Sequence, residues 1–108
     1  MNDQQIENEI QAKGLTAPRI TRDHIESLIV GETYTTLPSL KVMICELTLR
    51  NGYTVRGDAA VVSRENFNQE IGRKISRENA FRQIWQLEGY LLQERLYLEK
   101  TSQEIFGG

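Results

Sequence analysis

Residues 63–98 read SRENFNQEIGRKISRENAFRQIWQLEGYLLQERLYL, and this stretch decides the fold. Ser63 and Ser76 are both good N-caps, and each is followed two residues later by a glutamate, which favours a helix start. Gly72 lies between them and is of the residue type that most often follows a helix end. The pattern therefore predicts a short helix that begins at Ser63 and a longer one over 77–98.

The longer predicted helix carries apolar residues at helical spacing around much of its surface. Its wide apolar stripe includes Phe81, Ile84, Trp85, Leu87, Leu91, Leu92 and Leu96, and it is broad enough for two partners. A second group, Tyr90, Leu92 and Tyr97, is left over once a small sheet is covered, and surplus apolar surface of this kind indicates an interface. Gly89 costs the helix roughly 1 kcal/mol relative to alanine and favours close approach of another backbone. We therefore expect a homo-oligomer.

The segment before this stretch predicts an antiparallel hairpin over 41–50 and 53–62. A two-residue turn would put apolar and charged residues on the same face, whereas the three-residue turn Arg50-Asn51-Gly52 makes one face wholly apolar. This register pairs Leu49 with Tyr53, Leu47 with Val55, Cys45 with Gly57, Met43 with Ala59, Thr48 with Thr54 and Glu46 with Arg56. Because two strands alone are marginal, we expect a third strand at 33–37, a covering helix or another subunit.

Two shorter helices are predicted nearer the N-terminus. The first spans 3–13, with Asp3 as its N-cap and Gly14 as its end, and the second begins after Thr21 and ends at Gly31. Together the elements predict an α+β fold, in which a small antiparallel sheet packs against helices and the C-terminal helix is long. The predicted division is an N-terminal arm or short helix at 1–18, a single domain at 19–98 and a loose tail at 99–108.

The composition argues against several classes of protein. A net charge of -2 does not suit a general nucleic-acid coat, and no apolar run approaches the ~20 residues of a membrane span. The single Cys45 and the lack of a signal-like N-terminus fit the cytoplasm. The lone His24 has no Cys or His cluster around it, so no metal is expected. We find no nucleophile with a base beside it and therefore expect neither catalysis nor a cofactor.

A set of arginines and amides near aromatic residues remains as a candidate ligand site. Arginine binds phosphate bidentately, aromatic rings stack on bases, and amides read base edges. For any single arginine, a solvated position on the polar face of a helix is the more common situation. The candidate ligand-binding residues are Arg22, Asn66, Phe67, Arg73, Arg77, Asn79, Arg82, Trp85 and Arg95.

The order of several uncommon motifs resembles the small phage proteins of the gene-49/gene-66 family. The motifs are Asn51-Gly52-Tyr53 with Val55 and Gly57, Asn66-Phe67 with Glu70 and Gly72, Asn79-Ala80, and Trp85 with Leu87-Glu88-Gly89-Tyr90 and Leu92. Asn68 departs from the pattern, because the family usually has aspartate there. The resemblance covers roughly residues 20 to 98.

The resemblance implies a function, since this family is identified as including the first type of Thoeris anti-defence protein. Such proteins are sponges that sequester a cyclic ADP-ribose variant made by an immune TIR enzyme, without cleaving it, and some also hold cyclic oligonucleotides. The implied partner is another copy of the chain, in a dimer-based homo-oligomer for which a hexamer is one candidate. The implied location is the cytoplasm of the infected bacterial host. The alternatives are a non-enzymatic module that binds a host protein and an enzyme that degrades the signal.

Overall fold

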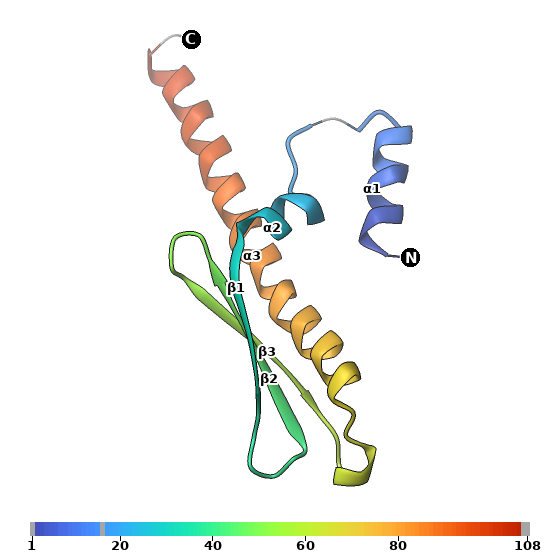
Figure 1. Ribbon diagram of the computed structural model, residues 1–108. Helices are drawn as coiled ribbons and strands as arrows, with labels where there is room; N and C mark the ends of the chain where they lie inside the picture. Colours follow the sequence, from blue (N-terminus) through green and yellow to red (C-terminus); the bar gives the residue numbers. More distant parts are fainter. Residues whose placement is uncertain (1, 16, 107–108) are drawn as a thin grey trace.

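The computed structural model describes residues 2–15 and 17–106, the last three of these by their backbone alone. The elements in chain order are α1 (Asp3–Ala12), α2 (Arg22–Leu28), β1 (Ile29–Thr36), β2 (Val42–Leu49), β3 (Thr54–Ala60), the 3-10 turn η1 (Arg64–Asn66) and α3 (Gln69–Phe106). The strands form one antiparallel sheet in the order β1-β2-β3, and α3 lies along it (Figure 1). This confirms the predicted α+β class.

The hairpin between β2 and β3 has the predicted register. Glu46 lies opposite Arg56, and each of the other predicted strand pairs from Met43 to Thr48 is present. The Leu49 N–H donates to the Tyr53 carbonyl oxygen at 2.8 Å, which closes the three-residue turn. Gly52 has a φ of 90°, in the left-handed region that glycine tolerates best. The side-chain alternation therefore predicted the turn correctly.

The predicted third strand is present as β1, which begins earlier than the sequence suggests. It pairs antiparallel with β2 from Ile29 onward, with a bulge between Ile29 and Gly31. The prediction that Gly31 ends the second helix is wrong, because α2 ends at Leu28 and Gly31 lies within the strand. A Cβ atom at Gly31 would lie 3.3 Å from the Thr48 Cβ, so this glycine allows a close contact between strands.

One apolar core lies between α2, the inner face of the sheet and the first half of α3. It consists of Ile25, Leu28, Cys45, Leu47, Leu49, Val55, Ala80, Phe81 and Ile84. The predicted cap of α2 is confirmed, since Thr21 Oγ1 accepts a hydrogen bond from the His24 N–H at 3.1 Å. Because the core ends near Ile84, the sheet supports only part of the long helix.

The predicted break between two C-terminal helices is wrong, because α3 is a single helix of 38 residues. Only the short η1 turn follows Ser63, whose side chain makes no capping hydrogen bond. Gly72 faces the Met43 side chain, and Ser76 is fully buried with its Oγ donating to the Arg73 carbonyl oxygen. These small residues face the sheet every four positions, so they allow close packing and do not end a helix.

Two further helix ends differ from the sequence predictions. The N-cap of α1 is Asn2 rather than Asp3, because Asn2 Oδ1 accepts from the Gln5 N–H while the Gln5 side chain bonds back to the Asn2 N–H. The segment predicted as a loose tail, 99–108, is helical as far as Phe106, and residues 107–108 lie outside the described part of the chain, as do Met1 and Thr16.

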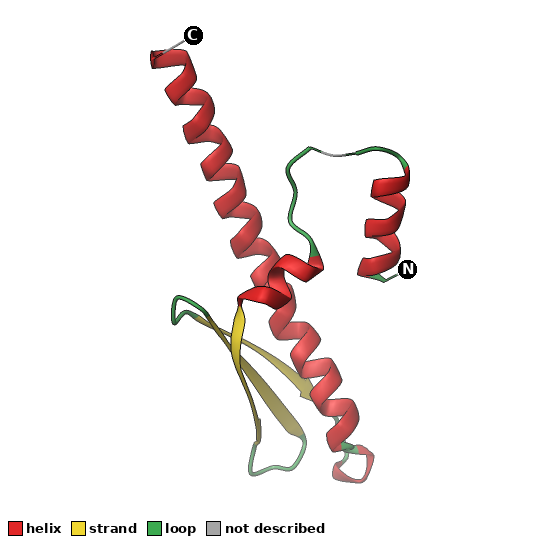
Figure 2. Ribbon diagram, turned by 45° about the horizontal axis from the view of Figure 1, so that its top comes forward, coloured by secondary structure: helices red, strands yellow, loops and turns green. Residues whose placement is uncertain are grey.

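The distal half of α3 projects beyond the sheet, as both ribbon views show (Figure 1 and Figure 2). The radius of gyration is 18.3 Å, against about 13 Å for a compact domain of this length. Tyr90, Leu91, Tyr97 and Leu98 on this half are each more than half exposed. Across the described residues, the helices lack the length and apolarity together needed to cross a bilayer. A long helix with exposed apolar side chains therefore extends from a small domain.

Candidate functional site

The predicted ligand-binding residues lie in separate regions of the structure. Asn66 and Phe67 lie at η1, at the start of α3, whereas Arg95 lies on the projecting half of the helix. Arg73 and Arg95 are about 33 Å apart along α3, since each helical residue advances about 1.5 Å. Within one protomer, these residues therefore cannot contact the same nucleotide.

Arg22 and Arg77 hold the helices together through carboxylates. Both Nη atoms of Arg77 donate to Glu26, at 2.9 and 3.1 Å, and its Nε donates to Glu32 at 2.8 Å. Arg22 donates to Glu78 at 3.1 and 3.2 Å and to Asp3 at 2.7 Å. The hydrogen bond to Glu26 is the main cause that raises the pKa of Arg77. The hydrogen bond to Glu78 is the main cause that raises the pKa of Arg22.

The two guanidinium groups also lie against one aromatic ring. The Cζ atoms of Arg22 and Arg77 are 4.1 and 5.8 Å from the centroid of Phe81, a fully buried side chain. With four carboxylates around two arginines, this cluster has a negative formal charge. It therefore suits a structural clamp better than a phosphate site.

The first half of α3 carries three further candidates, of which Asn79 is half-buried and Arg73 and Arg82 are exposed. Asn79 Nδ2 donates to the Asp58 carbonyl oxygen at 2.8 Å, which ties α3 to β3, and Arg82 donates to Asn79 Oδ1 at 3.4 Å. The Arg73 Cζ lies 5.6 Å from the centroid of the Tyr34 ring. Asn79 thus has a structural contact, while Arg73 and Arg82 are exposed cations.

The aromatic candidates border different cavities. Trp85 packs edge-to-face on Phe81, with centroids 6.3 Å apart, and lines a cavity of about 230 Å³ beneath α1. Phe67 lines a cavity of about 480 Å³ with Arg64 and Glu65, next to the exposed Asn66. Neither ring has more than one of the candidate arginines beside it in its cavity.

A basic cavity of about 310 Å³ lies where α2, the hairpin turn and α3 meet. Its lining residues are Arg19, Ile20, His24, Arg50, Glu88, Leu91, Leu92 and Arg95. The turn is held there because the Arg50 N–H donates to the Leu28 carbonyl oxygen at 2.9 Å. Among the described residues, neither Arg50 nor Arg95 has an ion-pair partner. The guanidinium groups of Arg50 and Arg95 thus line one cavity without a carboxylate partner among the described residues.

Glu88 is the single carboxylate that lines the basic cavity. Its Oε1 lies 2.8 Å from His24 Nε2, and its side chain is only 15% exposed. The sequence reading left His24 without a role, because the glutamate that faces it is 64 residues away in the chain.

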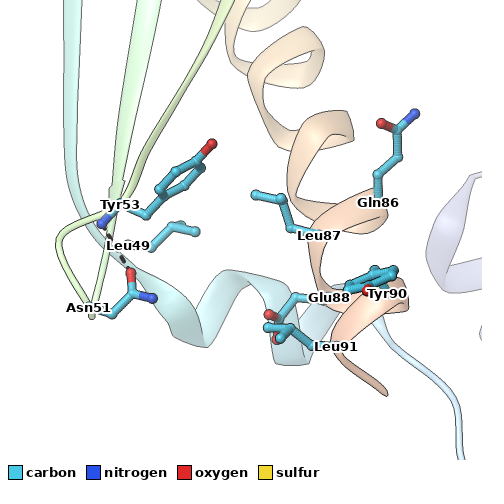
Figure 3. A pocket seen from close by; sticks show the side chains of 8 residues that line it. All are labelled: Leu49, Asn51, Tyr53, Gln86, Leu87, Glu88, Tyr90 and Leu91. Carbon is cyan, nitrogen blue, oxygen red and sulfur yellow. Dashed lines mark hydrogen bonds between the residues drawn. The ribbon is translucent and has the colours of Figure 1, made fainter. Parts of the chain in front are cut away.

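An aromatic cavity of about 340 Å³ adjoins the basic one. Its lining residues are Leu49, Asn51, Tyr53, Gln86, Leu87, Glu88, Tyr90 and Leu91. Figure 3 shows Leu49 and Tyr53 on the hairpin pointing toward Leu87 on the helix. Asn51 Oδ1 accepts a hydrogen bond from the Tyr53 N–H at 3.0 Å, which fixes the turn that carries the Tyr53 ring.

The two cavities share Glu88 and Leu91, so they form one composite site. Each is at the small end of ligand pockets, which measure about 300–1,000 Å³. One side offers apolar and aromatic surface with amides, and the other offers arginines. This arrangement suits an amphipathic anion with a flat ring, such as a nucleotide.

Of the predicted site residues, the composite site includes only Arg95. The sequence reading missed Arg19, Arg50 and Tyr53, which come from the linker and the hairpin. The sequence did place Arg50 in the hairpin turn, directly after the first strand of the hairpin. What could not be seen was that α2 and α3 bring other basic residues next to this turn.

Comparison with known proteins identifies the family of the chain. The family profile matches residues 20–96, which span α2, the sheet and most of α3, whereas α1 and Arg19 precede the match. No curated protein and no solved structure gives a significant match. The chain belongs to the phage protein (N4 Gp49/phage Sf6 gene 66) family.

Proposed function

We propose that this phage protein is an anti-defence sponge, which sequesters a cyclic nucleotide immune signal without cleaving it. The proposed ligand is the cyclic ADP-ribose variant of the Thoeris system, with cyclic oligonucleotides as further ligands. The observation that supports this most is the basic cavity that adjoins an aromatic one. The protein would act in the cytoplasm of the infected host.

The chemistry of the composite site divides the ligand into two parts. The pyrophosphate would lie on Arg50 and Arg95, which have no carboxylate partner among the described residues. A base would lie on the apolar side, against Tyr53 and Leu87, with Asn51 and Gln86 available for its polar edge. Glu88 stands between the two halves and could accept a hydrogen bond from a ribose hydroxyl.

Sequestration differs from catalysis in what the site must do. Equilibrium capture needs a dissociation constant well below the signal concentration, so roughly nanomolar affinity, or about -12 kcal/mol, is required. Such affinity needs nearly complete burial of the ligand. We propose that the chain supplies this burial and leaves the bonds of the ligand intact.

Burial of the ligand would be completed by a second copy of the chain. Tyr90 and Leu91 line the aromatic cavity and are also more than half exposed. Gly89, between them and Glu88, has no atom within 4 Å of where a Cβ would lie, so another backbone can approach there. We propose a dimer-based homo-oligomer, with a hexamer as one arrangement, formed through the distal half of α3.

Heat release followed by mass spectrometry tests this function. Purified protein incubated with the product of an immune TIR enzyme is washed, denatured and analysed for small molecules. The proposal predicts recovery of the intact cyclic nucleotide in a fixed ratio to the chain. Recovery of a cleaved product would instead indicate an enzyme, and recovery of nothing would remove the sponge.

A module that binds a host protein is the second candidate. The exposed apolar face of α3, with Tyr90, Tyr97 and Leu98, favours it. The two candidates differ in the release experiment, because a protein-binding module frees no nucleotide. They also differ in solution, because a homo-oligomer would cover this face with its own copies.

A further inference from the structure

The helix α1 is an acidic arm with little apolar attachment. It contains Asp3, Glu7 and Glu9 and no basic residue, and none of its residues is buried. Ile6 is 43% exposed even though it faces the cavity under α1. An isolated helix of this length is marginal in water, so its contacts with the domain decide whether it stays in place.

The polar contacts of α1 with the domain are ion pairs to two arginines, while Ile6 and Ile10 face Ile20 and Trp85 across a cavity. Asp3 pairs with Arg22 at 2.7 Å, and Glu7 accepts two hydrogen bonds from Arg19, one of them from Nε at 3.1 Å. Arg19 Nη1 donates to the Leu15 carbonyl oxygen at 3.1 Å. The Arg19 hydrogen bond is also the main cause that lowers the pKa of Glu7.

Arg19 lines the basic cavity and is therefore part of the composite site. While Glu7 is bound to it, its charge is neutralised, and its Nε and Nη2 atoms donate to Glu7 while its Nη1 atom donates to the Leu15 carbonyl oxygen. A phosphate group that approaches the Nε–Nη2 edge of Arg19 would need the same donors in the same bidentate geometry. Glu7 and an anionic ligand thus compete for the Nε–Nη2 edge of one guanidinium group.

We infer that α1 is an intramolecular competitor of the anionic ligand, with Glu7 holding Arg19 until a phosphate group displaces it. This inference rests on the proposed function of the composite site. The arm would leave at low cost, since none of its own residues is fully buried. Binding would then exchange the half-buried Arg19–Glu7 ion pair for a phosphate contact inside the cavity.

Two variants of the full-length chain separate this role from simple charge removal. Glu7→Gln removes the competitor, whereas Glu9→Gln removes the same charge from the same helix at a residue that pairs with Lys13 instead, at 3.0 Å. The probe is inorganic pyrophosphate, titrated by calorimetry at fixed ionic strength. We expect Glu7→Gln to bind about two- to fivefold more tightly than Glu9→Gln and wild type, a modest factor because surface pairs are weak.

Hydrogen exchange of the α1 amides supplies a second measurement on the wild-type chain. The inference predicts faster exchange across α1 when pyrophosphate is added, because the arm is released. Equal pyrophosphate binding by all three proteins, with unchanged exchange in α1, would overturn the arm and leave the anion site standing. Failure of all three to bind pyrophosphate would overturn both.

Discussion

Gly57 on β3 is where the sheet and the long helix meet through their backbones. A Cβ atom there would lie 2.5 Å from the Ser76 carbonyl oxygen and 2.6 Å from the Asn79 carbonyl carbon, and closer still to the Ala80 nitrogen. Backbone atoms of a helix cannot move aside as the end of a side chain can. The lack of a side chain at this residue therefore sets how closely α3 packs on β3.

Gly57→Ala is expected to destabilise the fold by about 3 kcal/mol, because the added methyl group must push two backbones apart. Urea denaturation followed by circular dichroism measures the change. The matched control is Gly72→Ala, where the new Cβ would meet only the Met43 side chain, at 3.4 Å or more. That change should be neutral or stabilise α3 by up to about 1 kcal/mol. Equal losses in both variants would contradict this close contact.

Arg77 joins α3 to α2 and β1 through Glu26 and Glu32. Its hydrogen bond is the main cause that lowers the pKa of Glu32. A carboxylate with a lowered pKa in the folded state stabilises the fold fully above its unfolded pKa of about 4.3. That contribution is lost as the pH falls through the lower, folded pKa.

Arg77→Met should therefore lower stability by about 2 kcal/mol at pH 7 and reduce the further loss on acidification. Urea denaturation at neutral pH and at several acidic values below about 5 measures both effects. Arg73→Met is the control, since Arg73 lies on the same helix and has no ion-pair partner among the described residues. A steep acid loss that is the same in both variants would show that the Arg77 pairs contribute little.

At the scale of elements, α3 is defined by the small residues that face the sheet. Gly72, Ser76 and Ala80 recur every fourth residue and are all buried. Sequence rules assign glycine and serine to helix ends, because each favours a cap. The same residues also let a strand approach a helix closely, and only the position of the sheet decides between these roles.

Lys74→Pro tests the continuity of α3. Lys74 is 76% exposed, so its replacement removes almost no packing. In a continuous helix the proline removes a backbone hydrogen bond and should cost about 3 kcal/mol, whereas between two helices it would be tolerated. Chemical denaturation of this variant and of Lys74→Ala measures the difference. Similar stability of the two variants would contradict a continuous helix and favour a break near Lys74.

The hairpin was predictable from the sequence, whereas the composite site was not. Alternation with a period of two leaves a single register that buries Leu47 and Val55 together, so local information was sufficient. The composite site joins Arg19, Arg50 and Arg95, which are far apart in the chain. Their proximity depends on the angle at which α2 crosses α3, and no spacing rule encodes that angle.

At the scale of the whole molecule, the distal half of α3 extends past the core and carries exposed apolar side chains. Leu98 is 54% exposed and Tyr97 58%, on a helix that extends well past the core. The protomer measures 63 by 33 by 22 Å, an elongated shape for 108 residues. Burial of this half against other copies would account for both the shape and the exposed apolar residues.

Light scattering after size-exclusion chromatography should give a mass that is a multiple of the 12.4 kDa chain. Leu98→Lys is expected to reduce that mass, because it places a charge in the proposed interface. Val62→Lys is the control, since Val62 is 89% exposed and lies outside α3, in the segment between β3 and η1. A wild-type mass of one chain would contradict the proposed assembly.

The central claim is that the composite site binds a cyclic nucleotide, and calorimetry with cyclic ADP-ribose isomers tests it most directly. The comparison uses wild type, Arg50→Gln/Arg95→Gln and Arg73→Gln/Arg82→Gln, each double variant removing two exposed arginines. We predict tight binding of one isomer by wild type and by the second variant, and a loss of at least about a hundredfold in the first. Absence of heat with wild type, or equal losses in both variants, would contradict the account.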